Sequence, residues 1–169
     1  KVLQIPILKD NYSYIITEDE SGLVACVDPS NSREIINFLD KNNLDLDLIL
    51  STHHHHDHVG GNLELKKKYN CKIIGNFDDQ KRIPGIDIPL KEDETYEFGD
   101  SRFKTIDTPG HTVGHISFYF EREGYLFCGD TIFSLGCGRI FEGTYDQMVQ
   151  SILKIKCLPK KTKIFCGHE

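Results

Sequence analysis

Histidine is concentrated in one interior stretch of the sequence. Residues 52–58 read Thr-His-His-His-His-Asp-His, so five of the eight histidines lie beside Asp57. Neutral imidazole is the commonest metal ligand in proteins, and imidazole together with carboxylate suits zinc and other divalent metals. The stretch is neither terminal nor uniform, which sets it apart from an added histidine tag. We therefore predict a metal site here.

The spacing within this stretch predicts two neighbouring half-sites. The apolar run Leu46–Leu50 precedes it and predicts a buried strand, whose end would hold ligands firmly. Residues two apart in an extended chain share a side, so His53 and His55 can face one point. If the chain then turns, Asp57 and His58 can face a second point. Zinc takes about four ligands, so residues elsewhere must complete both half-sites.

Three further ligand types lie at the ends of predicted strands. His111, Asp130 and His168 each follow a glycine. Alone, each could be a capping or buried polar residue, but with the histidine stretch they predict two sites, bridged by the two carboxylate oxygens of Asp130. The predicted ligands are His53, His55 and His111 for one metal, Asp57, His58 and His168 for the other, and Asp130 for both.

Some residues near these ligands are expected to have supporting roles. His54, His56 and His115 are predicted to lie in loops or to hydrogen-bond to the ligands. Asp28 ends a predicted strand before Pro29 and is expected near the floor of the site.

Hydrophobic periodicity and turn residues predict an α/β domain around the ligands. Asn31 and Thr144, each followed three residues later by Glu or Gln, form capping-box patterns that begin two helices. A third helix is expected over Leu63–Tyr69, and the polar residues 78–94 are expected to form a surface loop. The predicted strands are Val2–Ile7, Tyr12–Thr17, Leu23–Asp28, Leu46–Ser51, Lys72–Gly75, Arg102–Asp107, Ser117–Phe120, Tyr125–Cys128 and Lys163–Cys166.

The composition restricts the class of protein. A chain of 169 residues is enough for one domain with a sizeable core. None of its six cysteines forms a C-x-x-C pair, which indicates reduced thiols and a cytoplasmic location. The net charge of −6 argues against a nucleic-acid partner, and no apolar run is long enough to span a membrane. We expect a monomer.

Several motifs together resemble the metallo-β-lactamase fold. They are the stretch 52–58, Thr-Pro-Gly-His at 108–111, Gly-Asp-Thr at 129–131 and Gly-His-Glu at 167–169. Asp-Asn-Tyr at 10–12 and the segment 136–144, Gly-Cys-Gly-Arg-Ile-Phe-Glu-Gly-Thr, are similar to the glyoxalase II (hydroxyacylglutathione hydrolase) family. The resemblance covers essentially the whole chain.

This resemblance implies a four-layer αββα sandwich with a binuclear zinc site, sometimes iron or manganese, at one edge of the two sheets. All seven ligand positions of the family are filled. Arg139 and Phe141 would line the glutathione groove, although Phe141 lacks the tyrosine hydroxyl often found there. The family continues into a C-terminal helical substrate-binding domain that this chain lacks, so residues 1–169 are expected to form the catalytic domain.

The implied reaction is hydrolysis of S-2-hydroxyacylglutathione, for example S-D-lactoylglutathione, in methylglyoxal detoxification. A metal-bridging hydroxide would attack the thioester carbonyl, with Asp57 and Asp130 as the catalytic carboxylates. A thiolate leaves readily, so no dedicated general acid is needed.

Two rival interpretations remain at the level of sequence. One is a persulfide dioxygenase of the same fold, with a single iron held by two histidines and an aspartate. The Gly-Cys-Gly-Arg loop at 136–139 argues against it. The other is a non-catalytic module that keeps the fold, although such proteins tend to lose ligands and here none is missing.

Overall fold

Two mixed β-sheets form the centre of the molecule. The structure, a computed structural model, describes residues 1–169. The first sheet has the strand order β1-β2-β3-β4-β5-β6, antiparallel from β1 to β3 and parallel from β3 to β6. Its strands are β1 (Val2–Ile7), β2 (Asn11–Thr17), β3 (Val24–Val27), β4 (Leu48–Leu50), β5 (Lys72–Asn76) and β6 (Ile88–Leu90).

The second sheet has the order β11-β10-β9-β8-β7. Neighbouring strands are antiparallel except β10 and β11, which are parallel because α4 connects them. Its strands are β7 (Thr95–Phe98), β8 (Ser101–Asp107), β9 (Ile116–Phe120), β10 (Tyr125–Gly129) and β11 (Lys163–Cys166).

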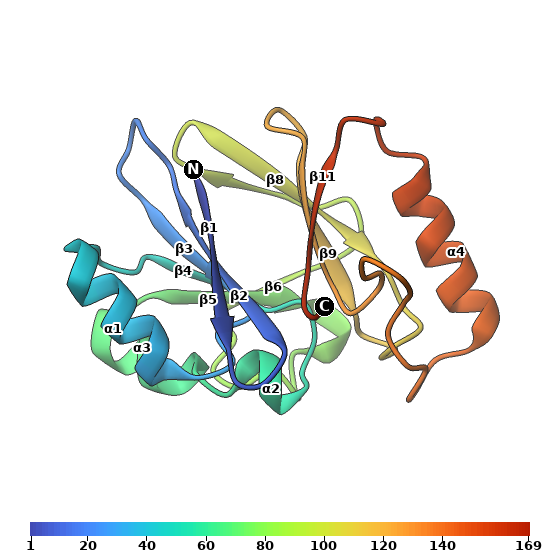
Figure 1. Cartoon of the computed structure of the whole chain (residues 1–169), viewed down its shortest axis with the longest axis horizontal. Coiled ribbons are helices and arrows are strands. Elements are labelled where there is room, and N and C mark those ends of the chain that lie inside the picture. The colour runs from blue at the N-terminus through green and yellow to red at the C-terminus, as the bar shows by residue number, and fades with distance from the viewer.

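Helices cover the outer faces of both sheets, so the predicted αββα sandwich is confirmed (Figure 1). α1 (Ser32–Asn42) and α3 (Asn62–Tyr69) lie on the first sheet, and α4 (Tyr145–Lys156) lies on the second. Two short elements, α2 (His56–Val59) and the 3₁₀ helix η1 (Phe77–Asp79), belong to the connections. All the helices are too short or too polar to cross a lipid bilayer.

Three hydrophobic clusters fill the interfaces between the four layers. Because side chains alternate along a strand, Ala25 and Val27 of β3 face the second sheet, whereas Cys26 faces the helices. The cluster between the sheets is rich in aromatic rings such as Phe118. A third, smaller cluster includes Ile155 of α4 and joins that helix to the second sheet.

Both predicted helix starts are confirmed, but only the second forms a full capping box. The Asn31 side chain accepts a hydrogen bond from the Arg33 backbone N–H at the start of α1, and Asn43 ends that helix in the left-handed conformation. Thr144 and Gln147 form a reciprocal capping box at the start of α4.

The prediction of a continuous surface loop over residues 78–94 is wrong. Ile88–Leu90 form β6, which pairs in parallel with β5, and Ile83 is buried in the core. Pro84 and Pro89 argued against a strand here because proline has no backbone N–H to donate. β6 lies at the edge of its sheet, however, where proline is tolerated. Strand β7 and the short helix α2 were also not predicted.

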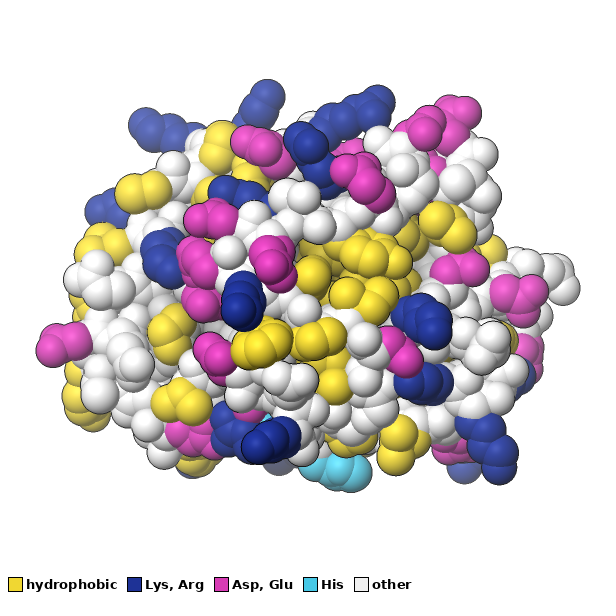
Figure 2. All heavy atoms as spheres, turned by 180° about the vertical axis from the view of Figure 1, so that it is seen from behind, with side chains coloured by type: hydrophobic (Ala, Val, Ile, Leu, Met, Phe, Trp, Pro, Cys, Tyr) yellow, Lys and Arg dark blue, Asp and Glu magenta, His cyan; other side chains and the backbone are white.

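Charged side chains of both signs are interspersed over the face opposite that of Figure 1. They surround a central group of hydrophobic side chains (Figure 2).

Candidate metal centre

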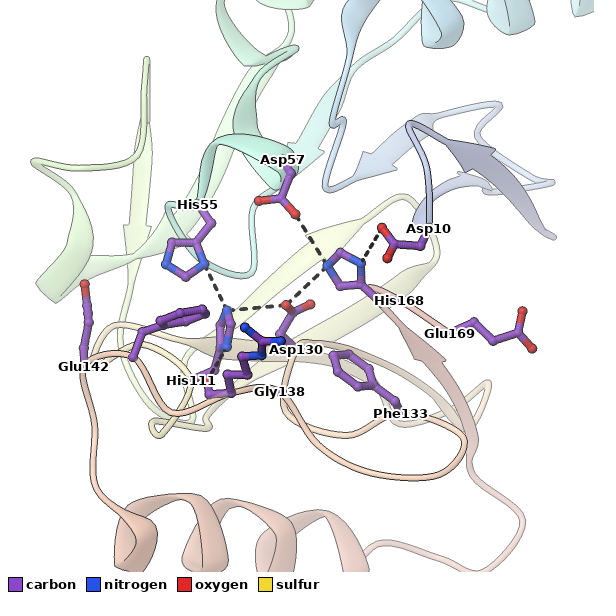
Figure 3. Close-up of a pocket in the computed structure, with 12 residues that line it drawn as sticks. Asp10, His55, Asp57, His111, Asp130, Phe133, Gly138, Glu142, His168 and Glu169 are labelled. Carbon is purple, nitrogen blue, oxygen red and sulfur yellow. Dashed lines mark hydrogen bonds and ion pairs between the residues drawn. The ribbon is translucent and has the colours of Figure 1, made fainter.

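The ends of strands from both sheets meet at one edge of the sandwich. β4 leads into the histidine stretch, and β8, β10 and β11 lead to His111, Asp130 and His168. The four segments, far apart in sequence, place their side chains around one cleft (Figure 3).

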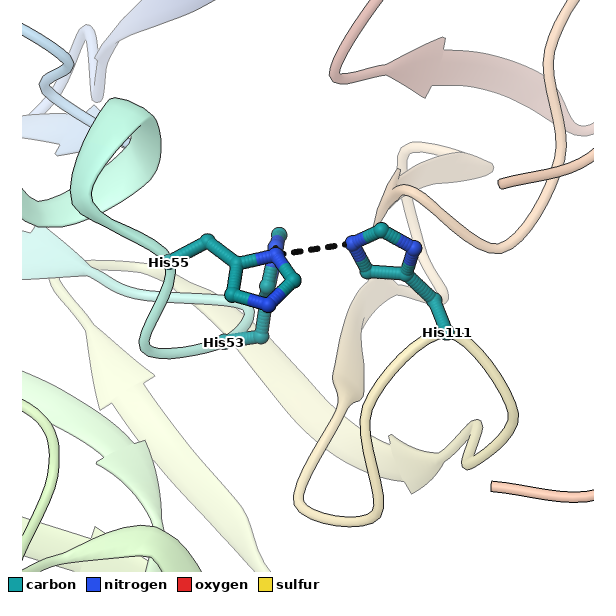
Figure 4. A group of neighbouring side chains, drawn as sticks. All are labelled: His53, His55 and His111. Atoms are coloured by element: carbon teal, nitrogen blue, oxygen red, sulfur yellow. Dashed lines mark hydrogen bonds between the residues drawn. The ribbon is translucent and has the colours of Figure 1, made fainter. Parts of the chain in front are cut away.

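Three histidines form a compact group at one end of this centre. His53 Nε2 and His55 Nδ1 are 3.1 Å apart, and His55 Nδ1 and His111 Nε2 are 2.9 Å apart (Figure 4). Their ligand atoms all lie within 4.8 Å of one another. Three imidazole nitrogens that converge in this way can donate lone pairs to one cation.

The predicted second group also comes together. His58 Nε2 lies 3.2 Å from His168 Nε2, and the Asp57 Oδ2 atom is 3.5 Å from each of these nitrogens. Asp57 and His58 lie in α2, whose first turn supplies the change of direction that their adjacent positions require. A mixed group of one carboxylate and two imidazoles suits a divalent metal of the zinc type.

Asp130 lies between the two groups. Its Oδ2 is 3.4 Å from His111 Nε2 and 3.3 Å from His168 Nε2, and its Oδ1 is 3.4 Å from His58 Nε2. Oδ1 is buried but makes no hydrogen bond. A buried carboxylate oxygen without a partner is costly, and a cation at the centre would stabilise it. The residues present therefore fit a metal.

Glycines leave the space that this arrangement needs. A Cβ on Gly167 would overlap Asp130 Oδ1 and His58, and a Cβ on Gly138 would overlap the Asp130 backbone carbonyl. Gly129 has a φ of +47°, so it also supplies a left-handed turn directly before Asp130.

Buried hydrogen bonds orient the histidine rings. The His111 Nδ1–H group donates to the Arg139 backbone carbonyl at 2.7 Å. His53 Nδ1 lies 3.0 Å from the Thr52 hydroxyl, which in turn donates to Asp28. Because Nδ1 carries the proton and makes these hydrogen bonds, the Nε2 lone pairs of His53 and His111 are free for a metal.

Asp28 is at the floor of the site, as predicted. Its carboxylate accepts from the Thr52 backbone N–H at 2.8 Å and lies 3.1 Å from His58 Nδ1. Asn11, the first residue of β2, donates to Asp57 Oδ2 at 2.9 Å. The predicted stretch Asp10-Asn11-Tyr12 thus lies beside the site, but its sequence did not reveal which residue Asn11 contacts.

The protonation of the histidines depends on their neighbours. Burial lowers the pKa of His53, His55 and His111. For His58 burial again acts to lower the pKa, but the carboxylates of Asp28 and Asp57 outweigh it and raise the value to about 10. Hydrogen bonds to Asp130 and Asp57 raise the pKa of His168 to about 10. The carboxylates therefore favour positive charge at the centre, which protons or metal ions can provide.

The three histidines expected to have supporting roles lie outside both ligand groups. His54 Nδ1 contacts Asp79 at 2.9 Å, and His56 is exposed on α2. His115 is buried and accepts a hydrogen bond from the Asp130 backbone N–H at 3.0 Å. Burial lowers the pKa of His115 to about 3, which keeps its ring neutral.

A cleft of about 590 Å³ opens over the centre (Figure 3). Arg139 and Phe141 both line it, and the Phe141 ring centroid is 5.3 Å from that of His111. The other lining residues are Asp10, His55, Asp57, Asp130, Phe133, Gly138, Glu142, His168 and Glu169. Phe133 and Glu142 were not singled out in the sequence, because nothing in their local pattern shows that the loop after β10 turns back over the metal centre.

Comparisons with known proteins agree with this geometry. A family model described as the metallo-beta-lactamase superfamily matches residues 8–168. The chain is 49% identical over 169 residues to a hydroxyacylglutathione hydrolase of Methylococcus capsulatus and 52% identical over 162 residues to one of Pelagibacter ubique. These matches include 100% and 96% of the chain, which spans about two thirds of each relative, 66% and 68%.

The fold is also that of a solved metallo-beta-lactamase. The crystal structure of the BLEG-1 B3 enzyme superposes with a TM-score of 0.90 at 25% identity, covering 100% of this chain and 92% of that one. The chain belongs to the metallo-beta-lactamase superfamily and, within it, to the hydroxyacylglutathione hydrolase family.

Proposed function

We propose that residues 1–169 form a catalytic domain that hydrolyses S-2-hydroxyacylglutathione thioesters, such as S-D-lactoylglutathione, to glutathione and a 2-hydroxy acid. The observation that carries this proposal is the convergence of seven histidine and aspartate side chains at the floor of an open cleft: two groups of three, with Asp130, whose Oδ1 is unpaired, beside both. The names of the relatives at 49% and 52% identity support the choice of substrate.

Two divalent cations, most simply zinc, with iron or manganese as alternatives, are proposed as the cofactors. His53, His55 and His111 would hold one of them, and Asp57, His58 and His168 the other, with Asp130 shared. When bound, such cations supply a water of lowered pKa and polarise the thioester carbonyl. Asp130 is suited to the shared role because its carboxylate faces histidines of both groups: Oδ1 lies beside His58, and Oδ2 lies beside both His111 and His168.

Asp57 is proposed to orient the attacking water. Its carboxylate faces the cleft, and the Asn11 amide holds Oδ2 in place at 2.9 Å. Asp57 Oδ2 also lies 3.5 Å from His168 Nε2, so this carboxylate is beside the ligand group at the cleft. The pKa of Asp57 is lowered far below its usual range by hydrogen bonds from His168 and His58, so it stays an acceptor at neutral pH.

Arg139 and Phe141 are proposed as substrate contacts. The Arg139 side chain is exposed at the cleft and forms no hydrogen bond or ion pair within the chain, so its guanidinium is free for a carboxylate of the glutathione moiety. Phe141 offers an apolar ring beside His55 and His111. The departing thiolate needs no proton from the protein.

A monomeric cytoplasmic protein without nucleic-acid or membrane partners is part of this proposal. The net charge of −6 and six unpaired cysteines support it.

Steady-state hydrolysis of S-D-lactoylglutathione, with metal content measured on the same sample, tests the proposal. We expect turnover that depends on metal and is lost with a chelator. Absence of turnover in a sample that holds two metals per chain would contradict the proposed activity of this domain.

A further inference from the structure

Arg82 lies between two carboxylates beside the metal centre but touches none of the predicted ligands. Its Nε donates to Asp79, and its Nη1 donates to Glu142. Asp79 belongs to η1, whereas Glu142 belongs to the loop that follows Asp130. One guanidinium thus joins two segments that are about 60 residues apart in the sequence.

Asp79 is the buried, rigid end of this cluster. The residue is only 1% exposed, and its second oxygen lies 2.9 Å from His54 Nδ1. A Cβ on Gly114 would come within 2.6 Å of the Asp79 carboxyl carbon, so that residue is packed tightly on this side as well. A buried carboxylate requires a cation and good hydrogen bonds, and Arg82 supplies both.

Glu142 is the more exposed end of the cluster. Its other oxygen accepts a hydrogen bond from the Val113 backbone N–H at 3.0 Å. Next to it, the Phe141 backbone N–H donates to the His111 carbonyl at 3.1 Å. The loop 138–142 is therefore attached to the His111 segment by its backbone and to Arg82 by one side chain.

This loop carries the proposed substrate contacts. Arg139 and Phe141 belong to it, and Figure 3 shows Glu142 at the end of the cleft beside His55 and His111, opposite Glu169. The residues of the loop are largely exposed, so few apolar contacts hold it in place. The Glu142 side chain is held by its ion pair with Arg82, by the Val113 N–H and, more weakly, by His54 Nε2 at 3.5 Å.

We infer that Arg82, held by the buried Asp79, is a positioning residue that fixes the loop 138–142 against the His111 segment and so sets the affinity for substrate. A loop that is already ordered spares the substrate the entropic cost of ordering it. This inference rests on the proposed function for its kinetic consequence, but its structural consequence can be measured without any substrate.

The test compares Arg82→Met with Arg82→Lys, and with Lys81→Met as the matched control. Lys81 is the exposed neighbour and has no ion pair. Three quantities are measured on each metal-loaded protein: metal per chain, the hydrogen-exchange rates of the Val113, Phe141 and Glu142 amides, and kcat and KM for S-D-lactoylglutathione.

In Arg82→Met we expect exchange of the three amides to accelerate at least about tenfold, with metal content unchanged. KM should rise roughly tenfold, the effect of losing about one charge-assisted hydrogen bond, while kcat changes less than about threefold. In Arg82→Lys the KM should lie between those of Arg82→Met and the parent protein. Lys81→Met should have the KM and exchange rates of the parent protein.

Arg82→Met leaves the buried Asp79 carboxylate without its cation, which can by itself unfold the protein. The double variant Asp79→Asn/Arg82→Met removes the buried charge together with its cation and keeps the test valid. Glu142→Gln should also raise KM. Adding it to Arg82→Met should cause little further change, because both substitutions remove the same Arg82–Glu142 ion pair.

Unchanged exchange in the loop would overturn the inference, and so would parallel losses of metal, kcat and stability. A parent protein that does not hydrolyse the thioester would contradict the proposed function alone, because the exchange rates would still report whether Arg82 holds the loop.

Discussion

The Asp28 carboxylate lies 3.1 Å from His58 Nδ1 and accepts the Thr52 hydroxyl at 2.7 Å, while that hydroxyl lies 3.0 Å from His53 Nδ1. One buried acid therefore orients a histidine from each of the two ligand groups. Asp28 has a φ of +47°, a left-handed conformation that aspartate and asparagine tolerate better than most residues.

Replacing Asp28 should weaken metal binding without touching a predicted ligand. We expect Asp28→Asn to lower metal affinity by about 10–100-fold, the usual effect of losing a hydrogen-bond partner of a ligand histidine. Asparagine keeps the backbone conformation and the Oδ1 acceptor for the Thr52 N–H, but its NH₂ replaces the oxygen that faces the Thr52 hydroxyl and His58 Nδ1, so any loss reports the removal of these two contacts. Chelator competition measures the affinity. The exposed Asp45→Asn is the control, and equal affinities in both variants would show that Asp28 does not orient the ligands.

Asp130→Ala should abolish hydrolysis with the fold intact. The change removes the cleft-lining carboxylate that lies within 3.4 Å of histidines of both groups, so we expect about one metal per chain instead of two. Turnover should fall by at least about 10³-fold, the size of the loss when a group that stabilises developing charge is removed.

Circular dichroism, metal analysis and turnover on one sample check this prediction. Near-normal turnover in metal-checked Asp130→Ala would contradict the proposal of a shared two-metal centre.

The sequence predicted the side chains that meet at the centre because their signals are local. His53 and His55 are two residues apart at a strand end, and His111, Asp130 and His168 each follow a glycine. The spacing along the chain predicted two neighbouring groups, while their place at one edge of the two sheets was implied by the family resemblance; the side chains do lie together.

Arg82 and Asn11 could not be assigned in this way. Their partners, Glu142 and Asp57, are distant in sequence, and only the packing of the two sheets brings them close. β6 was missed for a related reason, since its pairing with β5 and not its own composition makes Ile88–Leu90 a strand.

Metal binding should release protons and tighten as pH rises. In the metal-free protein His58 and His168 have pKa values of about 10, so both hold a proton at pH 7 that a metal must displace. We expect up to about two protons released per chain and an affinity that increases between pH 6 and pH 9. Titration calorimetry in buffers of different ionisation enthalpy measures this release.

His168→Asn serves as the comparison for this titration. It should release about one proton fewer than the parent protein, because one of the two protonated rings is gone. A pH-independent affinity in the parent protein would show that the two histidines are already neutral before metal binds.

Asp107, at the end of β8, should destabilise the protein at neutral pH. Burial, followed by repulsion from Glu92, raises the pKa of Asp107 to about 6, and its Oδ1 is buried without a hydrogen bond. The folded protein therefore binds this proton more tightly than the unfolded chain does. The carboxylate therefore costs stability above pH 6, and the cost disappears as the pH falls toward 4.

Asp107→Asn should remove this cost. We expect the free energy of unfolding at pH 7 to rise by about 1 kcal/mol. The difference between a pKa of about 6 and the ordinary value near 4 corresponds to about 2.7 kcal/mol, which partial exposure to solvent reduces. Near pH 4.5 the gain should shrink, because the parent carboxyl is then protonated in the folded state. Urea denaturation at both pH values, with Asp45→Asn as the control, measures the difference. A variant that is less stable than the parent at pH 7 would contradict this prediction, because it would show that the Asp107 carboxylate stabilises the folded protein.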